Sequence, residues 1–246
     1  MIQLFKNGAR GSSGRPIGHA TYSDSNGNES NEDSLLLLSA DSYYGNVTLA
    51  CICDGLGGMG SGEIASGYVA EELSVWFYKE LPQVLIHGRG RKTIYNAIYK
   101  KLYMIHNRLK EYSGHIDTTP CTTCTVLFFY GRYCHLFQIG DSSAFFFNNR
   151  LKKLTIDNNI SRNQLSSCIG IGAFAVSLYK CLPRRRGYYL LCSDGIGEYM
   201  DETRVLNMLR GDDDSFPKDN MLRTIAKHCA GNGSKDNMSC ILLKFE

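Results

Sequence analysis

The chain has 246 residues, of which 43% are hydrophobic and 21% charged, the composition of a globular protein large enough to bury a sizeable core. Its net charge of +3 is too small to indicate a nucleic-acid-binding protein. No apolar run approaches the roughly 18–20 residues that span a bilayer, and the first residues lack the apolar centre of a signal peptide. We therefore expect a cytoplasmic protein that binds neither membrane nor nucleic acid.

The first half of the chain is predicted to form strands followed by two helices. Residues 1–16 show little periodicity and are interpreted as a poorly ordered lead-in or a first edge strand. Apolar runs predict strands over 19–23, 34–40 and 47–53, the last two joined as a hairpin. From residue 62 the apolar spacing is that of a helix ending at Pro82, and a second amphipathic helix is predicted over 91–112.

The second half is predicted to be mainly strands. These cover 123–130, 133–139, 144–148 and 151–156, before a polar segment over 157–167. Residues 174–182 and 188–192 are expected to form another hairpin, followed by helices over 202–209 and 218–229 and a strand over 238–245. With no linker to divide it, the chain is expected to form one α+β domain over residues 1–246. Two antiparallel sheets would form a central β-sandwich covered by helices.

The chain contains ten cysteines. Several lie in apolar runs, as expected of free thiols packed into the core of a protein in a reducing compartment. Cys121 and Cys124 have the spacing of zinc ligands, but no second close pair of cysteines or histidines completes a four-ligand site. The expectation is reduced core thiols rather than structural zinc.

Five aspartates stand at the ends of predicted strands: Asp33, Asp54, Asp141, Asp194 and Asp236. Asp54 opens a glycine-rich stretch, and glycine lets a backbone approach a ligand closely. If the strands pack in neighbouring sheets, the carboxylates meet at one end, where they raise each other's pKa unless cations neutralise them. Ligand sets made only of oxygen select Mg²⁺, Mn²⁺ or Ca²⁺ over zinc. The alternative for each aspartate is an ordinary turn residue or helix cap.

The order of these motifs resembles that of the metal-dependent serine/threonine protein phosphatases of type 2C, in particular the compact, bacterial-style members. The matching segments, spread over residues 17–245, are Asn31-Glu32-Asp33, Asp54-Gly55-Leu56-Gly57-Gly58, Ile139-Gly140-Asp141-Ser142, Cys192-Ser193-Asp194-Gly195 and Lys235-Asp236-Asn237. The resemblance implies a β-sandwich flanked by pairs of helices. It also implies two Mn²⁺ or Mg²⁺ ions at one end, with a weakly bound third.

The resemblance further implies a role for each motif. Asp54 would bridge both ions, and the Gly55 carbonyl would bind one of them. The other implied ligands are Asp194 and Asp236 on the second ion, Glu32 and Asp33 beside the pair, and Asp141 on the third ion. Water activated between the ions would hydrolyse phosphoserine and phosphothreonine in protein substrates. Such an enzyme would oppose a serine/threonine kinase in signalling.

The match fails at three positions. Asn28 stands where the family has a phosphate-binding arginine, Ser143 where many members have arginine, and Leu56 where many eukaryotic members have a histidine proposed as general acid. The sequence offers three candidates for the missing positive charge and does not rank them: Arg15, Arg162 and residues 184–186. These departures leave two alternatives: a catalytically weak relative that binds phosphorylated partners, and a phosphatase of small phosphorylated metabolites.

Overall fold

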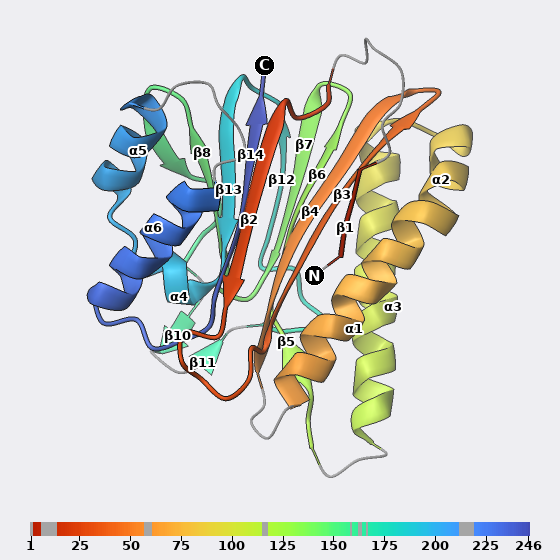
Figure 1. Ribbon diagram of the computed structural model, residues 1–246. Helices are drawn as coiled ribbons and strands as arrows, with labels where there is room; N and C mark the ends of the chain where they lie inside the picture. The colour runs from red at the N-terminus through yellow and green to blue at the C-terminus, as the bar shows by residue number, and fades with distance from the viewer. Residues whose placement is uncertain are drawn as a thin grey trace.

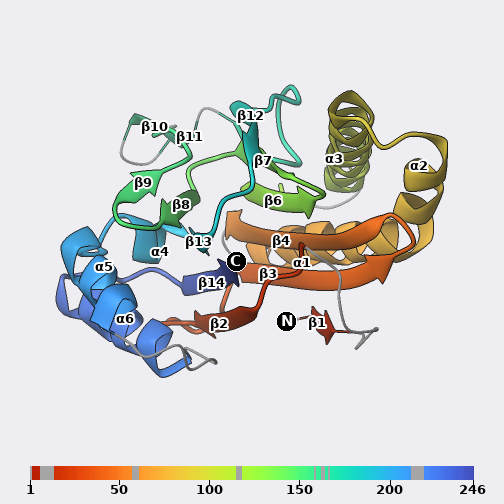
Figure 2. The same cartoon turned by 90° about the horizontal axis from the view of Figure 1, so that it is seen from above.

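Two β-sheets lie face to face between two groups of helices (Figures 1 and 2). The computed structural model describes residues 2–5, 14–56, 61–114, 118–157, 159–161, 164–165, 167–211 and 219–246. Within these residues, no helix combines the length and the hydropathy needed to cross a membrane.

The larger sheet has the strand order β1-β3-β4-β6-β7-β12, with β5 paired beside β4. All of its pairings are antiparallel except that of β1 with β3, which is parallel. The strands are β1 (Ile2–Phe5), β3 (Asp33–Ser42), β4 (Gly45–Leu56), β5 (Cys121–Thr122), β6 (Cys124–Tyr130), β7 (Tyr133–Ile139) and β12 (Leu178–Pro183).

The smaller sheet has the order β2-β14-β13-β8-β9 and is antiparallel throughout. Its strands are β2 (Gly18–Asp24), β14 (Met238–Phe245), β13 (Gly187–Cys192), β8 (Ser143–Phe147) and β9 (Leu151–Lys153). A separate antiparallel pair, β10 (Asn159–Ser161) and β11 (Gln164–Leu165), follows β9 in the chain.

Helices cover the outer face of each sheet (Figure 2). On the larger sheet lie α1 (Ser61–Val75), the π-helical turn η1 (Trp76–Glu80), α2 (Leu81–His87) and α3 (Arg91–Ser113). On the smaller sheet lie α4 (Asp194–Gly197), α5 (Glu202–Gly211) and α6 (Asp219–Gly231). Buried apolar side chains form three core layers: one between α1–α3 and the larger sheet, one between the sheets, and one between the smaller sheet and α4–α6. The predicted α+β sandwich is confirmed.

Two local predictions were wrong. Residues 178–183 and 187–192 do not form a hairpin, because β12 pairs with β7 in one sheet and β13 with β8 and β14 in the other. The helical run does not end at Pro82, which lies in the first turn of α2, where proline costs no hydrogen bond. The first edge strand offered for residues 1–16 is present as β1, which pairs in parallel with β3 at the edge of the otherwise antiparallel sheet.

Candidate active site

The register of the strands brings the motif residues to one end of the sandwich, at the bottom of Figure 1. In the larger sheet Asp33, at the start of β3, pairs directly with Asp54 near the end of β4. The same end carries the start of β6 and the end of β7. In the smaller sheet the start of β8, the end of β13 and the start of β14 are likewise adjacent, since Cys192 pairs with both Ser143 and Cys240. Asp141, Asp194 and Asp236 lie in the connections beside these strand ends.

Two threonines hold the backbone of Asp54 through hydrogen bonds. Its N–H donates to Thr123 Oγ1 at 3.0 Å, and its carbonyl accepts from the Thr123 N–H at 2.9 Å and from Thr122 Oγ1 at 2.8 Å. Both threonines are buried. The carboxyl group of Asp54 therefore extends from a backbone with little freedom to move, although the sequence analysis assigned these threonines no role.

Glu32 and Gly55 meet at the first turn of α1. The Gly55 N–H donates to the Glu32 carbonyl at 3.2 Å, and Ser66 Oγ donates to the same carbonyl at 2.6 Å. A Cβ on Gly55 would lie 2.3 Å from the Gly62 carbonyl oxygen, and one on Gly62 would lie 2.3 Å from Glu32 Oε2. Both positions require glycine because backbone and carboxylate pack directly against them. The glycines at 57, 58 and 60 lie outside the described residues.

Ser193 links the two sheets below the carboxylates. Its Oγ donates to Asp33 Oδ2 at 2.9 Å and accepts from the Ser239 N–H at 3.0 Å, and its side chain is fully buried. Ser193 stands within the motif Cys192-Ser193-Asp194-Gly195, but the sequence predicted no role for it. A signal was available, because a buried hydroxyl at the end of an apolar strand needs a hydrogen-bond partner.

Asn237 organises the loops around Asp236. Its Oδ1 accepts from the Glu32 N–H at 2.8 Å, and its Nδ2 donates to the carbonyls of Ser25 and Ser30 at 3.1 and 3.2 Å. The Asn237 N–H donates to Asp236 Oδ1 at 2.7 Å. One amide side chain thus ties the segment before β3 to the segment before β14.

Burial and mutual repulsion perturb the carboxyl groups. Burial, followed by the charges of Asp33, Asp194, Asp236 and Asp141, raises the pKa of Asp54 well above its ordinary value. Burial and the charge of Asp236 raise the pKa of Asp194 to about 7. For Asp33, burial raises the pKa to about 6 although the hydrogen bond from Ser193 opposes the shift. This site favours protons or cations over free carboxylates.

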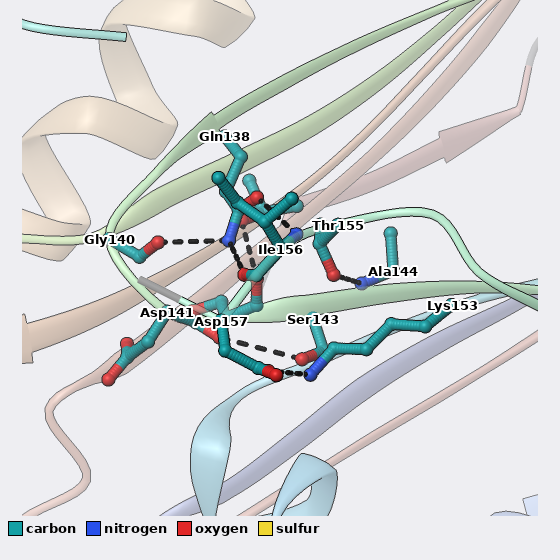
Figure 3. Close-up of polar contacts among 11 residues, drawn as sticks. Gln138, Gly140, Asp141, Ser143, Ala144, Lys153, Thr155, Ile156 and Asp157 are labelled. Atoms are coloured by element: carbon teal, nitrogen blue, oxygen red, sulfur yellow. Dashed lines mark hydrogen bonds and ion pairs between the residues drawn. The ribbon is translucent and has the colours of Figure 1, made fainter. Parts of the chain in front are cut away.

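Asp141 lies at the crossing from β7 to β8 (Figure 3). Gln138 holds this crossing: its Nε2 donates to the carbonyls of Gly140 and Ile156 at 3.0 and 2.9 Å, and its Oε1 accepts from the Ile156 N–H at 3.0 Å. Figure 3 shows the Asp141 carboxylate directed away from this network. Its charge is near enough to Asp54 and Asp194 to raise the pKa of both.

The residues present fit a hard divalent cation. Asp33 Oδ1 and Asp194 Oδ1 are buried atoms without a hydrogen-bond partner, and such atoms are costly unless something binds them. The donors are carboxylate and carbonyl oxygens, which suit Mg²⁺ and Mn²⁺. Over the described part of the chain, no three carboxylates bring their oxygens within 4.8 Å of one another. Carboxylates of like charge repel one another, and a cation bound among them would relieve the repulsion.

A polar cavity of about 490 Å³ opens beside the carboxylates. Within its described lining, Lys235 is the only basic residue. Asn28 also faces this cavity, but its Nδ2 already donates to the carbonyls of Ser25 and Lys235 at 2.9 and 3.0 Å. The lining residues are Asn28, Glu29, Ser30, Glu32, Tyr199, Lys235, Asp236 and Asn237.

Most of the arginines considered as replacements lie at the other end of the sandwich. Residues 184–186 precede Gly187, which pairs with Phe245, whereas the carboxylates lie near the opposite end of β14. Arg15 lies at the same far end, two residues before Ile17, whose N–H donates to the Lys244 carbonyl. With about 3.3 Å per residue, the length of β14 separates these arginines from the carboxylates by on the order of 20 Å. Arg162 lies outside the described residues.

A family model and several solved structures match this chain. The family model described as protein phosphatase 2C matches residues 22–243. A search of curated protein sequences found no match. Among solved structures, the serine/threonine phosphatase Stp1 from Staphylococcus aureus superimposes with a TM-score of 0.80 at 22% identity, covering 98% of this chain and 100% of that one.

Two further solved structures share the fold. A serine/threonine phosphatase of S. agalactiae gives a TM-score of 0.78 at 18% identity and covers 93% of this chain and 99% of its own. The Mycobacterium tuberculosis serine/threonine phosphatase PstP/Ppp gives 0.71 at 21% identity, covering 93% and 98%. At these identities the structural likeness establishes the fold.

Proposed function

Because the chain belongs to the protein phosphatase 2C family and is a protein serine/threonine phosphatase, we propose that it hydrolyses phosphoserine and phosphothreonine in proteins with Mn²⁺ or Mg²⁺ as cofactor. The observation that carries the proposal is the pair of unpartnered buried oxygens, Asp33 Oδ1 and Asp194 Oδ1, within a group of carboxyl groups whose pKa values are raised. Protonation alone would not account for so many carboxyl groups at one end of the sandwich.

We assign each acidic residue a place around two ions. Asp54 and the Gly55 carbonyl would hold one ion, and Asp54, Asp194 and Asp236 would hold the second. Asp33 and Glu32 lie beside the pair, and Asp141 would contribute to a weaker third position. When bound, such ions lower the pKa of water and neutralise phosphoryl oxygens. The chain's own contribution is the rigid backbone around Asp54 and the Ser193 hydrogen bond that orients Asp33.

The cavity beside Asp236 is proposed to receive the phosphorylated side chain. Glu29, Glu32 and Asp236 make its described lining acidic, so a phosphate dianion would be repelled without a cation. Lys235 supplies a positive charge at the cavity, whereas the Asn28 amide is engaged with backbone carbonyls. We therefore assign Lys235 the phosphate contact that Asn28 cannot make. As a point charge, lysine lacks the bidentate geometry of arginine.

The proposed setting is cytoplasmic signalling, in which the enzyme opposes a serine/threonine kinase. Its partners would be phosphorylated proteins. The open, polar form of the cavity suits an exposed phosphorylated loop better than a small metabolite, which needs an enclosing pocket.

The test is a Mn²⁺-titrated phosphatase assay on phosphopeptides, with wild type beside Asp54→Asn and Asp236→Asn. Each amide keeps the shape of the carboxyl group and removes one charged ligand, so activity should fall by at least about a hundredfold if the ion is lost. Asp41→Asn, an acidic residue at the far end of β3, is the matched control and should retain activity.

Two outcomes would contradict the proposal. Absence of turnover by wild type with excess Mn²⁺, together with binding of phosphopeptides that Asn28→Arg does not convert into turnover, would favour the phosphoprotein-binding alternative. Faster hydrolysis of small phosphorylated metabolites than of phosphopeptides would favour the metabolite alternative.

A further inference from the structure

Three cysteines form a compact group in the helix-facing core layer of the larger sheet. Cys51 Sγ lies 3.5 Å from Cys53 Sγ and 3.7 Å from Cys124 Sγ, and all three sulfurs fall within 4.8 Å of one another. Their side chains are 1%, 0% and 0% exposed. No other group of potential metal ligands among the described residues is as closely packed. The group contains no carboxylate and is distinct from the acidic site described above.

The sheet places these thiols together. Cys51 and Cys53 are two residues apart on β4, so their side chains point to the same face. Cys124 begins β6, and the pairing of Ile52 with Thr125 puts it opposite Cys53 at the next position. All three belong to the apolar layer beneath α1 and α3. The strand pairing therefore sets where the three residues lie relative to one another.

The geometry and the surroundings restrict what such a group can bind. With bonds of about 2.3 Å from ion to sulfur, the two measured separations correspond to sulfur–ion–sulfur angles of roughly 100° and 107°. Both angles suit a three-coordinate pyramid, and the third separation, between Cys53 Sγ and Cys124 Sγ, is below 4.8 Å. A tetrahedral zinc site would need a fourth ligand, which the described residues do not supply.

The charge of the three thiolates further restricts which ions the group can bind. Three thiolates carry a charge of −3, and a net charge in an apolar core is strongly unfavourable. A monovalent or divalent soft ion would leave the site negatively charged, whereas a trivalent ion leaves it neutral. Thiophilic trivalent ions with a lone pair, of which As(III) is the simplest, form neutral pyramidal complexes with three sulfurs.

We propose that Cys51, Cys53 and Cys124 form a binding site for a trivalent thiophilic ion, entered as arsenous acid. In the binding step three As–O bonds and three S–H bonds break, three As–S bonds form, and the hydroxyl groups leave as three molecules of water. Arsenic remains trivalent, so no oxidant or reductant is needed. The thiol protons leave with the water, and no charge enters the core.

The site lies directly behind the proposed phosphatase centre. Cys53 precedes Asp54, and Cys124 follows Thr123, whose backbone and side chain both hold Asp54. Binding at the thiols would place an ion directly against this support, and we expect phosphatase activity to change. That consequence rests on the proposed function, whereas ion binding does not.

The experiment uses the full chain, reduced with a phosphine and exposed to sodium arsenite in two ways: during refolding, because the thiols are buried, and by long incubation of the native protein. Mass spectrometry under non-denaturing conditions should show one arsenic gained and three hydrogens lost per chain. X-ray absorption at the arsenic edge should show three sulfur neighbours. Neither readout depends on activity.

Variants locate the site. Alanine at Cys51, Cys53 or Cys124 should abolish the three-sulfur signal, whereas Cys134→Ala, which removes a fully buried thiol of β7, should keep it. If circular dichroism shows that an alanine variant does not fold, Cys124→Val, of similar volume, is used instead. The proposal is overturned if refolded wild type binds no arsenic, if arsenic has two sulfur neighbours, or if Cys121→Ala abolishes binding and the cluster variants do not.

Discussion

At the scale of single residues, the carboxylates depend on neutral groups that hold them. Ser193 shows this most clearly, because its hydroxyl donates to Asp33 from the opposite sheet while accepting from the Ser239 backbone. Partners of this kind fix the orientation of metal ligands, and their loss commonly weakens metal affinity by about 10–100-fold. Ser193 is thus a positioning residue for Asp33.

We predict that Ser193→Ala raises the Mn²⁺ concentration needed for half-maximal activity by about 10–100-fold, with partial recovery at saturating Mn²⁺. Titration of activity with Mn²⁺ measures the shift. The control is Ser39→Ala, which removes a buried hydroxyl hydrogen-bonded to Thr48 away from the site. Both variants should lose about 1 kcal/mol of stability. An unchanged Mn²⁺ requirement in Ser193→Ala would remove its positioning role.

Lys235 is proposed to replace the missing phosphate-binding arginine. Lys235→Ala should raise KM for phosphopeptides about 10-fold, the effect of losing about 1.4 kcal/mol from a charged contact. Lys235→Arg should retain a KM near that of wild type, and Lys227→Ala on the exposed face of α6 is the matched control. A similar KM for wild type and Lys235→Ala, at any ionic strength, would exclude the assignment.

At the scale of secondary-structure elements, buried polar side chains connect neighbouring elements. Lys101 of α3 is 4% exposed and pairs with Glu72 of α1 at 2.7 Å and with Glu80 of η1 at 3.2 Å. The π-helical turn places Trp76 edge-on to Phe128 of β6, with ring centroids 6.1 Å apart. An irregular turn thus lets one apolar face follow the sheet past Pro82 into α2.

His135 connects β7 to β12. Its Nδ1 lies 3.0 Å from the Tyr179 hydroxyl, and burial, together with the charge of Arg91 on α3, lowers its pKa from 6.5 to about 4. Between pH 6.5 and 4 the unfolded chain binds a proton at this histidine and the folded protein does not. Folding stability from His135 is therefore complete above pH 6.5 and is lost as the pH falls.

We predict that His135→Gln, whose amide can still bond Tyr179, makes the protein less sensitive to acid. Wild type should lose about 1–2 kcal/mol more unfolding free energy than the variant between pH 7 and pH 5. Denaturant unfolding of both proteins in EDTA gives the comparison, and using the difference cancels the carboxylates common to both. Equal losses in the two proteins would show that His135 does not carry this pH dependence.

At the scale of the whole molecule, two sheets contribute like charges to one end of the sandwich. Without cations this arrangement opposes folding, because burial and repulsion raise the pKa values of Asp33, Asp54 and Asp194. Bound cations would reverse the effect. We therefore expect the stability of the protein to depend on whether cations occupy the proposed centre.

We predict that Mn²⁺ at 100 times its dissociation constant stabilises the protein by about 2.7 kcal/mol per ion bound, and raises Tm by about 5–10 °C over EDTA. Asp54→Asn should be at least as stable as wild type in EDTA, since one repelling charge is gone. In Mn²⁺ the variant should be less stable than wild type. A single transition in both conditions is expected of the one domain proposed for residues 1–246. An Asp54→Asn protein less stable than wild type in EDTA would contradict this account.

The sequence by itself determined the class of fold, and it predicted the acidic residues of the proposed centre. Strand and helix periods are local properties, and motifs such as Asp54-Gly55 and Lys235-Asp236-Asn237 can be read directly from neighbouring residues. Only the tertiary structure decided which strands share a sheet. It showed that the chain crosses between sheets at 184–186, where the sequence pattern indicated a hairpin.

Tertiary structure also decided which polar groups act together. Register brought Asp33 opposite Asp54, placed Ser193 beneath Asp33, and moved Arg15 and residues 184–186 to the far end. It gathered Cys51, Cys53 and Cys124, which the sequence analysis treated as separate core thiols, into one group. The physical reason is that most of these contacts join different strands. Packing across the whole fold, together with the apolar pattern of each strand, sets which strands pair and in which register.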